Sequence, residues 1–377
     1  MINFTSNINF SLMSLKCGII GVANVGKSTL FNCMSSTRVE TSSFAFTSSK
    51  SNVGVVNVPD PRLYRLEEFQ TTQKVVPATV EIVDIPGLAK GASHGEGVGN
   101  KFLSDIRNTD ALIHVLRCFD DDQLPHIDGS VDPVRDIETI NLELQVKDVE
   151  SVEKKLERQA KLAKSGEKEA RRGIEVLERF RDHLENFQNA RTLEVPEADR
   201  KFLDDMFLLT SKPVMYVCNV EDDAASSGNA YVEQVREYLT GEDAEILVLA
   251  ARLESEIAEL EDEADRKEFL DDAGLSEPGV NKLIRSAYSM LNLISFFTVG
   301  PKEIRAWTVR RGALAPEAAG AIHSDLQRGF IRAEVMKYED FVTLGSEHAC
   351  KEHGKLAVEG KNYEVQDADI LHIRFNV

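Results

Sequence analysis

The stretch Gly21-Val-Ala-Asn-Val-Gly26-Lys27-Ser28 decides the fold, because it stands directly between a strand-like run and a helical pattern. The run before it, residues 16–20, is short and largely apolar, and from Thr29 onward apolar residues repeat at helical spacing. In that context the glycines let the backbone curl so that successive N–H groups point at phosphate oxygens. The stretch therefore predicts a phosphate-binding loop (P-loop) at the first turn of an α/β sheet.

Each residue of this loop has an expected role toward a nucleoside triphosphate and a magnesium ion. The Lys27 ammonium reaches the β- and γ-phosphates, and the Ser28 hydroxyl takes a magnesium position. Asn24 has two interpretations: its side chain holds a monovalent cation such as K⁺ against the phosphates, or it stabilises the loop. The residues expected to contact the nucleotide are Asn24, Val25, Gly26, Lys27, Ser28 and Thr29.

An acidic residue closes another predicted strand, in Asp84-Ile-Pro-Gly87. Beside a P-loop such an aspartate holds magnesium, usually through water, and the Gly87 N–H is expected to sense the γ-phosphate. Leu88 stands where Ras-like enzymes carry the glutamine that orients the attacking water, and leucine cannot hydrogen-bond water. The expected catalytic residues are Lys27, Gly87 and Leu88, and we expect slow hydrolysis unless a partner or an ion helps.

Two further strand ends carry the residues expected to bind the base. Ordinary GTPases read guanine with an N/T-K-x-D motif, but the chain has Asn219-Val-Glu-Asp222, so Val220 replaces the lysine that stacks on the base. Ala250-Ala251 ends the last predicted strand of this region, where a backbone amide commonly meets the purine. The expected base-binding residues are Asn219, Val220, Glu221, Asp222, Ala250 and Ala251.

Six short runs rich in β-branched residues alternate with helical stretches through the first two-thirds of the chain. They are Lys16–Ile20, Val53–Val56, Thr79–Val83, Ala111–Leu116, Val214–Cys218 and Glu245–Leu249. This alternation predicts an α/β fold with a mostly parallel sheet covered on both faces. Ligands of such sheets bind at the carboxyl ends of the strands, where all the motifs above fall.

The remaining segments predict two additions to this sheet. Residues 132–205 carry apolar residues at helical spacing, beginning with Leu142, around a turn at 164–166. This pattern predicts an inserted, coiled-coil-like helical hairpin. Between 151 and 181 it has ten basic and six acidic residues, typical either of a solvated, ion-paired helix pair or of a surface that reads a partner. From 296 the pattern changes to short strands around a helix at 316–328, a compact α+β module. The expected strands are Phe297–Val299, Ala306–Val309, Lys355–Val358 and Ile370–Phe375.

These patterns predict four parts of the chain. They are an extension without regular structure at 1–14, a P-loop domain from 15–131 and 206–291, the hairpin at 132–205, and the C-terminal module at 292–377.

Composition excludes several classes of protein. Of 377 residues 42% are hydrophobic and 28% are charged, and no run reaches the roughly 18 apolar residues that a membrane helix needs. The net charge of −19 argues against a surface that coats nucleic acid broadly, though not against a local basic patch. Five scattered cysteines without a CxxC pair fit buried thiols in a reducing compartment. We expect a soluble, cytoplasmic, monomeric protein that does not enter the membrane.

The motifs together resemble the YchF family, the Obg-like ATPases, over about residues 16–377. The most specific segments of the resemblance are Asn24–Phe31, Gly91–Phe102, Leu253–Leu260, Arg305–Val309, Gly329–Val335 and His372–Val377. The C-terminal segments resemble a TGS domain, a ubiquitin-like fold associated with RNA-binding and ribosome-associated factors. The resemblance implies a preference for ATP over GTP, association with the ribosome and its rRNA, and hydrolysis stimulated by K⁺ at Asn24. It also implies a hydrophobic residue in place of the catalytic glutamine, which Leu88 matches.

Two departures from the family pattern bear on the expected site. The family's base-reading motif is usually N-x-x-E, and the corresponding residue here is Asp222, which is closer to the guanine-reading pattern. The family's first switch contains two prolines that this chain lacks, and alignment from Asn52 puts Ser48 at the magnesium-contacting threonine.

The leading hypothesis is an ATP-binding and ATP-hydrolysing P-loop switch on the translation machinery, with Ser28, Ser48 and Asp84 toward Mg²⁺. We favour ATP because Val220 removes the stacking lysine. Two alternatives stay open: a GTPase of Obg type, and a nucleotide-binding ribosome or RNA adaptor with negligible hydrolysis.

Overall fold

The computed structural model of the chain describes residues 15–36, 52–87 and 98–376. The chain divides into two compact units, of which the larger takes 16–56 and 82–291 and the smaller takes 57–81 and 292–377. The helical hairpin region belongs to the larger unit together with the sheet. The sequence-based division differs at 57–81, which it places in the P-loop domain and the structure places with the C-terminal residues.

The larger unit contains the six-stranded sheet that the sequence predicts, in the order β2-β4-β1-β5-β6-β7. Its strands are β1 (Lys16–Ile20), β2 (Asn52–Asn57), β4 (Thr79–Asp84), β5 (Ala111–Arg117), β6 (Val214–Asn219) and β7 (Ile246–Leu249). The pairs β1–β5, β5–β6 and β6–β7 are parallel. Each of the six predicted runs is therefore a strand of one sheet, and the mostly parallel α/β architecture is confirmed.

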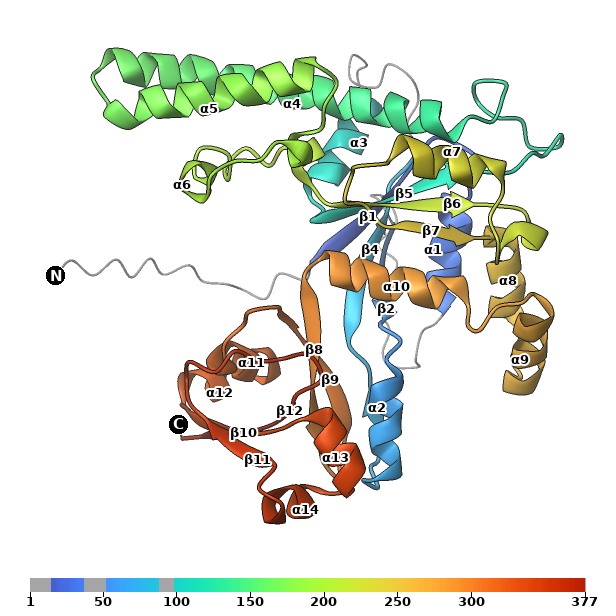
Figure 1. Ribbon diagram of the computed structural model, residues 1–377, viewed down its shortest axis with the longest axis vertical. Helices are drawn as coiled ribbons and strands as arrows, with labels where there is room; N and C mark the ends of the chain where they lie inside the picture. The colour runs from blue at the N-terminus through green and yellow to red at the C-terminus, as the bar shows by residue number, and fades with distance from the viewer. Residues whose placement is uncertain (1–14, 37–51, 88–97, 377) are drawn as a thin grey trace. The chain divides into compact units, whose positions relative to one another are not determined.

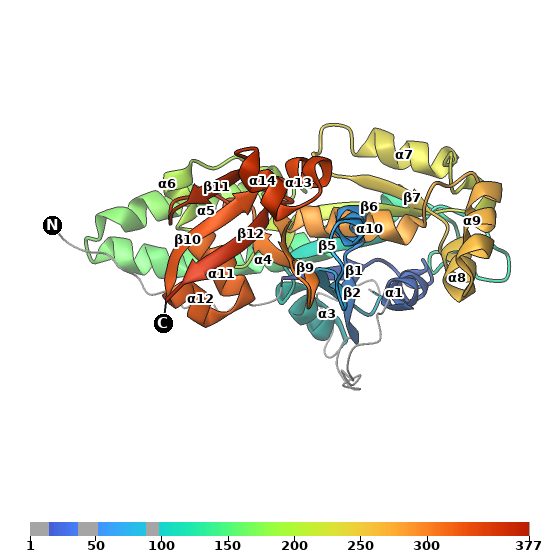
Figure 2. The ribbon, with the colours of Figure 1, turned by 90° about the horizontal axis from the view of Figure 1, so that it is seen from below.

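Helices cover both faces of this sheet. The helices of the larger unit are α1 (Lys27–Ser36), α3 (Val98–Arg107), α4 (Pro133–Lys164), α5 (Lys168–Glu185), α6 (Glu197–Arg200), α7 (Ala230–Tyr238), α8 (Ala251–Glu259), α9 (Glu263–Asp272) and α10 (Gly279–Met290). Short 3-10 turns lie at Ala190–Thr192, Leu209–Ser211 and Asp222–Ala224. Helices α4 and α7 lie on one side of the strands and α10 lies on the other (Figure 1). Helix α1 packs beside α8, as the view from below shows (Figure 2).

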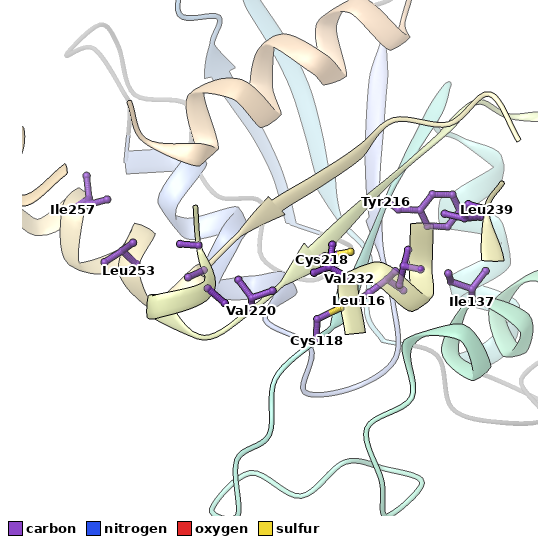
Figure 3. Packing of buried hydrophobic residues seen from close by; sticks show 14 of the residues in the cluster. Leu116, Cys118, Ile137, Tyr216, Cys218, Val220, Val232, Leu239, Leu253 and Ile257 are labelled. Carbon is purple, nitrogen blue, oxygen red and sulfur yellow. The ribbon is translucent and has the colours of Figure 1, made fainter. Parts of the chain in front are cut away.

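The core sits on the central strands, because parallel strands covered by helices are buried along their whole length. All seven residues of β5 are buried. A cluster of apolar side chains fills the space between the ends of β5 and β6 and the helices α7 and α8, and includes Leu116, Cys218, Val220 and Leu253 (Figure 3). This packing fixes the positions of the strand ends that carry the motifs.

The five cysteines are all free and buried, in agreement with the expectation of buried thiols. Within the described ranges, no helix combines the length and the apolar composition that crossing a membrane requires.

The predicted hairpin is present as α4 and α5, with its turn at Ser165–Gly166. The Asp132 side chain caps α4 by accepting from the Arg135 N–H at 3.0 Å, and proline occupies the first turn, where its missing N–H costs nothing. Apolar side chains from both helices form a separate small core. This core contains Val152, Val176, Leu177, Phe180, Leu184, Ala190, Phe202 and Leu208.

The buried face of α4 is more polar than the apolar spacing predicts. Leu142, expected on the apolar stripe, is 45% exposed, whereas Asp148 is buried. The Asp148 carboxylate accepts hydrogen bonds from Leu209 N and Thr210 N, both at 2.8 Å, and from Thr210 Oγ1 at 2.7 Å. It thereby fastens the hairpin to the segment that leads into β6.

The smaller unit is a second six-stranded sheet, in the order β11-β10-β12-β8-β9-β3. Its strands are β3 (Val75–Val76), β8 (Leu293–Val299), β9 (Ile304–Arg310), β10 (Phe330–Met336), β11 (Leu356–Glu359) and β12 (Ile370–Phe375). Its helices are α2 (Pro61–Arg65), the 3-10 turn Leu66–Glu68, α11 (Ala315–Ile322), α12 (Ser324–Arg328), α13 (Tyr338–Leu344) and α14 (Glu347–Glu352).

Contacts distant in sequence explain why 57–81 joins this unit. Strand β3 extends the sheet by pairing in parallel with β9. The Arg62 guanidinium binds the neighbouring Asp60 and also reaches Asp367 at 2.7 Å. The sequence around Arg62 gives no sign of a partner some 300 residues away. The sequence-based boundary therefore misses this segment.

Two details of the smaller unit correct the sequence-based expectation. The expected helix at 316–328 is two helices, because His323 has an extended backbone and its imidazole caps α12 by accepting from the Asp325 N–H at 3.1 Å. Strand β10, absent from the expected strands, lies inside the sheet between β11 and β12. Its exposed and charged positions weaken the apolar signal.

We expect Asp148→Ala to destabilise the larger unit by about 3 kcal/mol or more, because it leaves two buried N–H groups and one hydroxyl without an acceptor. Glu153→Ala, on an exposed position of the same helix, is the matched control and should change stability by less than about 0.5 kcal/mol. Urea unfolding followed by far-UV circular dichroism measures both. Equal stability of the two variants would contradict the clamping role of Asp148.

Candidate nucleotide-binding site

The P-loop connects β1 to α1 at the carboxyl end of the central strands, where the sequence predicts it. Helix α1 begins at Lys27, and the Leu30 N–H donates to the Gly26 carbonyl at 3.0 Å. Asn24 and Gly26 have positive φ angles of 64° and 99°, so the backbone curls in the left-handed region. A loop turned in this way onto a helix N-terminus presents backbone N–H groups and a positive dipole to an anion.

Asn219 holds the P-loop against the ends of two other elements. Its buried side chain donates from Nδ2 to the Val25 carbonyl at 2.9 Å and accepts from the Ala251 N–H at 2.8 Å. The approach is so close that a Cβ added to Gly26 would lie 2.5 Å from Asn219 Nδ2. One amide therefore joins the predicted phosphate motif to both predicted base motifs.

Lys27 is buried at the start of α1. It is 8% exposed, and its Nζ donates to the Val22 carbonyl at 2.6 Å. Burial lowers the pKa of Lys27 to about 8, and the nearby Asp84 carboxylate opposes that shift. The Asp84 carboxylate offsets only part of the cost of burying the Lys27 charge. A phosphate group bound beside the ammonium would offset more of that cost.

Ser28 and Asp84 meet beside Lys27, as expected of a metal pair. The Ser28 hydroxyl donates to Asp84 Oδ2 at 3.2 Å. Burial raises the pKa of Asp84, and the Ser28 hydrogen bond and the Lys27 charge lower it. A hydroxyl and a carboxylate are the hard oxygen donors that Mg²⁺ takes alongside phosphate oxygens. These residues fit a magnesium ion, which would neutralise charge on the phosphates.

Gly87 follows β4 and lies directly against the P-loop. A Cβ added at Gly87 would stand 2.9 Å from Lys27 Nζ and 3.2 Å from the Ala23 backbone nitrogen. Only glycine fits this approach without a shift of the neighbours. The Gly87 backbone is thereby next to the Lys27 ammonium, which is the position that the expected γ-phosphate sensor requires. Leu88 and Ser48 lie outside the described residues.

The base-reading motif divides into residues with structural partners and residues that face outward. Val220 is buried in the core. The Glu221 carboxylate accepts from the Asp120 N–H at 3.3 Å and from Asn229 Nδ2 at 3.0 Å, so the protein already engages both of its oxygens. Asp222 is 37% exposed at its side chain and faces Arg252 at 3.6 Å.

The backbone of the second base motif, Ala250-Ala251, also has a hydrogen-bond partner within the protein. Ala250 and Ala251 are buried, and the Ala251 N–H donates to Asn219. Thr29 is exposed on the first turn of α1.

Sequence reasoning missed Arg252 and Asn229. Arg252 directly follows the alanine pair, and Asn229 precedes an apolar helical pattern as an N-cap, accepting from Tyr231 N at 3.1 Å and Val232 N at 3.2 Å. The N-cap signal was readable in the sequence. The link from Asn229 to Glu221 depends on the fold.

Comparison with protein families matches both parts of this arrangement. The model described as a 50S ribosome-binding GTPase matches residues 16–162, and the C-terminal YchF-GTPase model, described as a protein of unknown function (DUF933), matches residues 293–376.

Full-length relatives extend these matches to the whole chain. The chain is 50% identical to the ribosome-binding ATPase YchF of Bacillus subtilis, over 97% of this chain and 100% of that protein. It is 46% identical to the protein of the same name from Escherichia coli O157:H7, with the same coverage. The solved structure of the Schizosaccharomyces pombe YchF GTPase superposes with a TM-score of 0.86 at 34% identity, covering 96% of this chain and 98% of that chain. With a P-loop fixed by Asn219 and relatives that match it from end to end, the chain belongs to the YchF family of P-loop nucleoside triphosphatases.

Proposed function

We propose that this chain is a slow, Mg²⁺-dependent ATPase that acts as a nucleotide-controlled switch on the ribosome, in the cytoplasm. The observation that carries the enzymatic part is the meeting of Lys27, Ser28 and Asp84 at the P-loop. The partner follows from full-length relatives that bear the name ribosome-binding ATPase.

In phosphoryl transfer, the site residues position the nucleotide and stabilise the charge on its phosphates. Backbone N–H groups at the start of α1 would bind the phosphates, with Lys27 on the β- and γ-phosphates. Ser28 and Asp84 would hold Mg²⁺, with Ser48 as a proposed third contact. The Gly87 N–H, adjacent to Lys27, would bond the γ-phosphate. Leu88 offers water no hydrogen bond, so the attacking water is not oriented there and the rate is low.

Asn24 is the proposed position for K⁺. Its side chain is exposed on the loop, and its backbone has a positive φ of 64°. An amide oxygen there could hold a monovalent cation against the phosphates, in place of an arginine finger.

ATP is the proposed nucleotide because of what surrounds the base motif. Val220 occupies the position at which the guanine-reading motif has its stacking lysine, and here it packs in the core. The Asp222 carboxylate faces the Arg252 guanidinium, which competes with guanine for it. A GTPase of Obg type is the second candidate, since Asp222 is the residue type that reads guanine.

We expect Lys27→Ala to lower the rate of ATP hydrolysis by roughly a hundredfold or more, because it removes the charge that stabilises the transferring phosphoryl group. Lys267→Ala, at an exposed position on α9, is the control and should leave the rate unchanged. Steady-state phosphate release with Mg²⁺ and K⁺ measures both. A rate of ATP hydrolysis by Lys27→Ala equal to that of the wild type would contradict the proposed enzymatic role.

The lowered pKa of Lys27 predicts how nucleotide affinity varies with pH. Below about pH 7 the ammonium is protonated before and after binding, so affinity is constant. Above about pH 8 the free protein has lost that proton and must regain it to pair with phosphate, so ATP affinity falls by up to about tenfold per pH unit.

Calorimetry from about pH 6.5 to pH 9.5, in buffers with different ionisation enthalpies, tests this linkage by detecting proton uptake on binding. Lys27→Arg is the matched control, because its guanidinium stays charged throughout and its affinity should not fall above pH 8. A wild-type affinity that is level up to pH 9.5 would rule out the proposed contact between Lys27 and phosphate.

The choice of base depends on Asp222 and is measured by calorimetry with ATP and GTP, each with Mg²⁺ and K⁺. We expect the wild type to bind ATP more tightly. Asp222→Asn should weaken GTP binding by roughly tenfold or more, since it removes a carboxylate acceptor, and should alter ATP binding by less than about threefold. Tighter binding of GTP by the wild type would instead support the GTPase of Obg type.

A further inference from the structure

A cleft of about 570 Å³ lies between the start of α4 and helix α7, two elements that pack against each other (Figure 1). None of its lining residues belongs to the P-loop or to the base motifs. The lining residues are Val131, Asp132, Val134, Arg135, Glu138, Tyr231, Gln234, Glu237 and Tyr238. The nucleotide chemistry described above therefore gives this cleft no role.

Two tyrosine rings belong to the α7 wall of the cleft. Tyr231, Gln234 and Tyr238 recur at spacings of three and four, so they share one face of that helix. Seven residues of helix separate the two rings by about 10 Å along its axis. The Tyr231 hydroxyl donates to Asp120 Oδ2 at 2.9 Å, whereas Tyr238 is 42% exposed. Burial, together with the neighbouring Glu138 carboxylate, raises the pKa of the Tyr238 hydroxyl, so the phenol stays neutral beside that carboxylate.

The cleft has an excess of negative charge. Glu138 and Glu237 are exposed, and no cation among the residues that the structure describes pairs with either of them. Arg135, which also lines the cleft, already has partners of its own. Its guanidinium donates to the Ser130 carbonyl at 2.7 Å and to Asp136 Oδ1 at 3.3 Å. The cleft therefore keeps two carboxylates without a cationic partner on the same walls as the two tyrosine rings.

We propose that this cleft binds an extended, basic segment of a partner protein, with two Lys or Arg side chains placed on Tyr231 and Tyr238. A cation over a tyrosine ring is attracted by the negative face of the ring, and a carboxylate beside the ring adds to that attraction. The half-buried Val131 and Val134 offer an apolar surface to the aliphatic stems of such side chains.

The spacing of the rings favours a protein segment over a free polyamine as the occupant. Cations three residues apart in a polyproline II segment lie about 9 Å apart on one side of it, which matches the separation of the rings. A stiff backbone holds its cations at that spacing, whereas a polyamine has to give up chain entropy to reach it. The inference goes beyond the proposed ATP hydrolysis and does not depend on it.

Fluorescence anisotropy of the full chain with a labelled peptide of four Arg-Pro-Pro repeats tests the proposal, because the prolines favour polyproline II and set the arginines three residues apart. Tyr238→Ala should weaken binding by roughly fivefold to thirtyfold, and Tyr238→Phe, which keeps the ring, should bind within about threefold of the wild type. Glu138→Gln with Glu237→Gln should weaken binding by roughly threefold to twentyfold, and this effect should shrink at high salt.

The matched control is Glu263→Gln with Glu268→Gln, which removes two exposed carboxylates of α9 outside the cleft and should bind the peptide like the wild type. Equal loss in the cleft pair and the control pair would overturn the proposal, because binding would then follow net charge alone. Equal affinity for a peptide of the same composition with its four arginines consecutive, together with no effect of Tyr238→Ala, would also overturn it.

Competition with spermidine separates the two sources of cations. Displacement of the labelled peptide by spermidine at a lower concentration than by the unlabelled peptide would overturn the assignment to a protein segment. ATP hydrolysis by the cleft variants should equal that of the wild type, and a failed peptide site would leave the enzymatic role of Lys27 intact.

Discussion

The nucleotide site depends on one buried amide, the side chain of Asn219. The ends of β1, β6 and β7 lead into three separate loops. Asn219 bonds the Val25 carbonyl with its nitrogen and the Ala251 N–H with its oxygen, so it fixes both neighbouring loops from the end of β6. An aspartate has no donor for the carbonyl, and a leucine would leave both groups buried and unpaired, at roughly 1–3 kcal/mol each. The close approach at Gly26 follows from the same contact.

The fold places Lys27 in this framework at a cost to its own stability. Its pKa of about 8, against 10.5 in water, corresponds to roughly 3 kcal/mol of unfavourable burial for the charged form. One carbonyl hydrogen bond and the Asp84 carboxylate offset only part of the lost hydration. A triphosphate would supply the missing charge, so energy stored in the free protein becomes available for binding. Gly87 stays free of a side chain for the same reason, because a methyl group there would press on the ammonium.

Sequence patterns were sufficient where the physical cause is local. Periodicity located all six strands of the larger sheet, and Gly26-Lys27-Ser28 located the loop, because a strand, a turn and a helix N-terminus are determined by consecutive residues. Patterns failed where the cause is distant. Glu254 caps the N-terminus of α10 by accepting from Gly279 N at 2.6 Å, and Asp60 with Asp367 holds Arg62. Glu221 was expected at the base, yet its partners Asp120 and Asn229 come close only after β5 and β6 have paired.

The segment between the hairpin and β6 shows how such distant contacts connect separate surfaces. Asp148 of α4 binds Leu209 and Thr210, and Lys212 donates to the Thr109 carbonyl just after α3. Both clamps therefore precede β6, the strand that ends in Asn219. They hold the chain at residues 209–212, directly before the strand that carries the base motif at its other end. A hairpin inserted into a sheet could pivot if only its two connections held it. A buried carboxylate with three donors removes that freedom, so the hairpin keeps a fixed position on the sheet that carries the nucleotide loops.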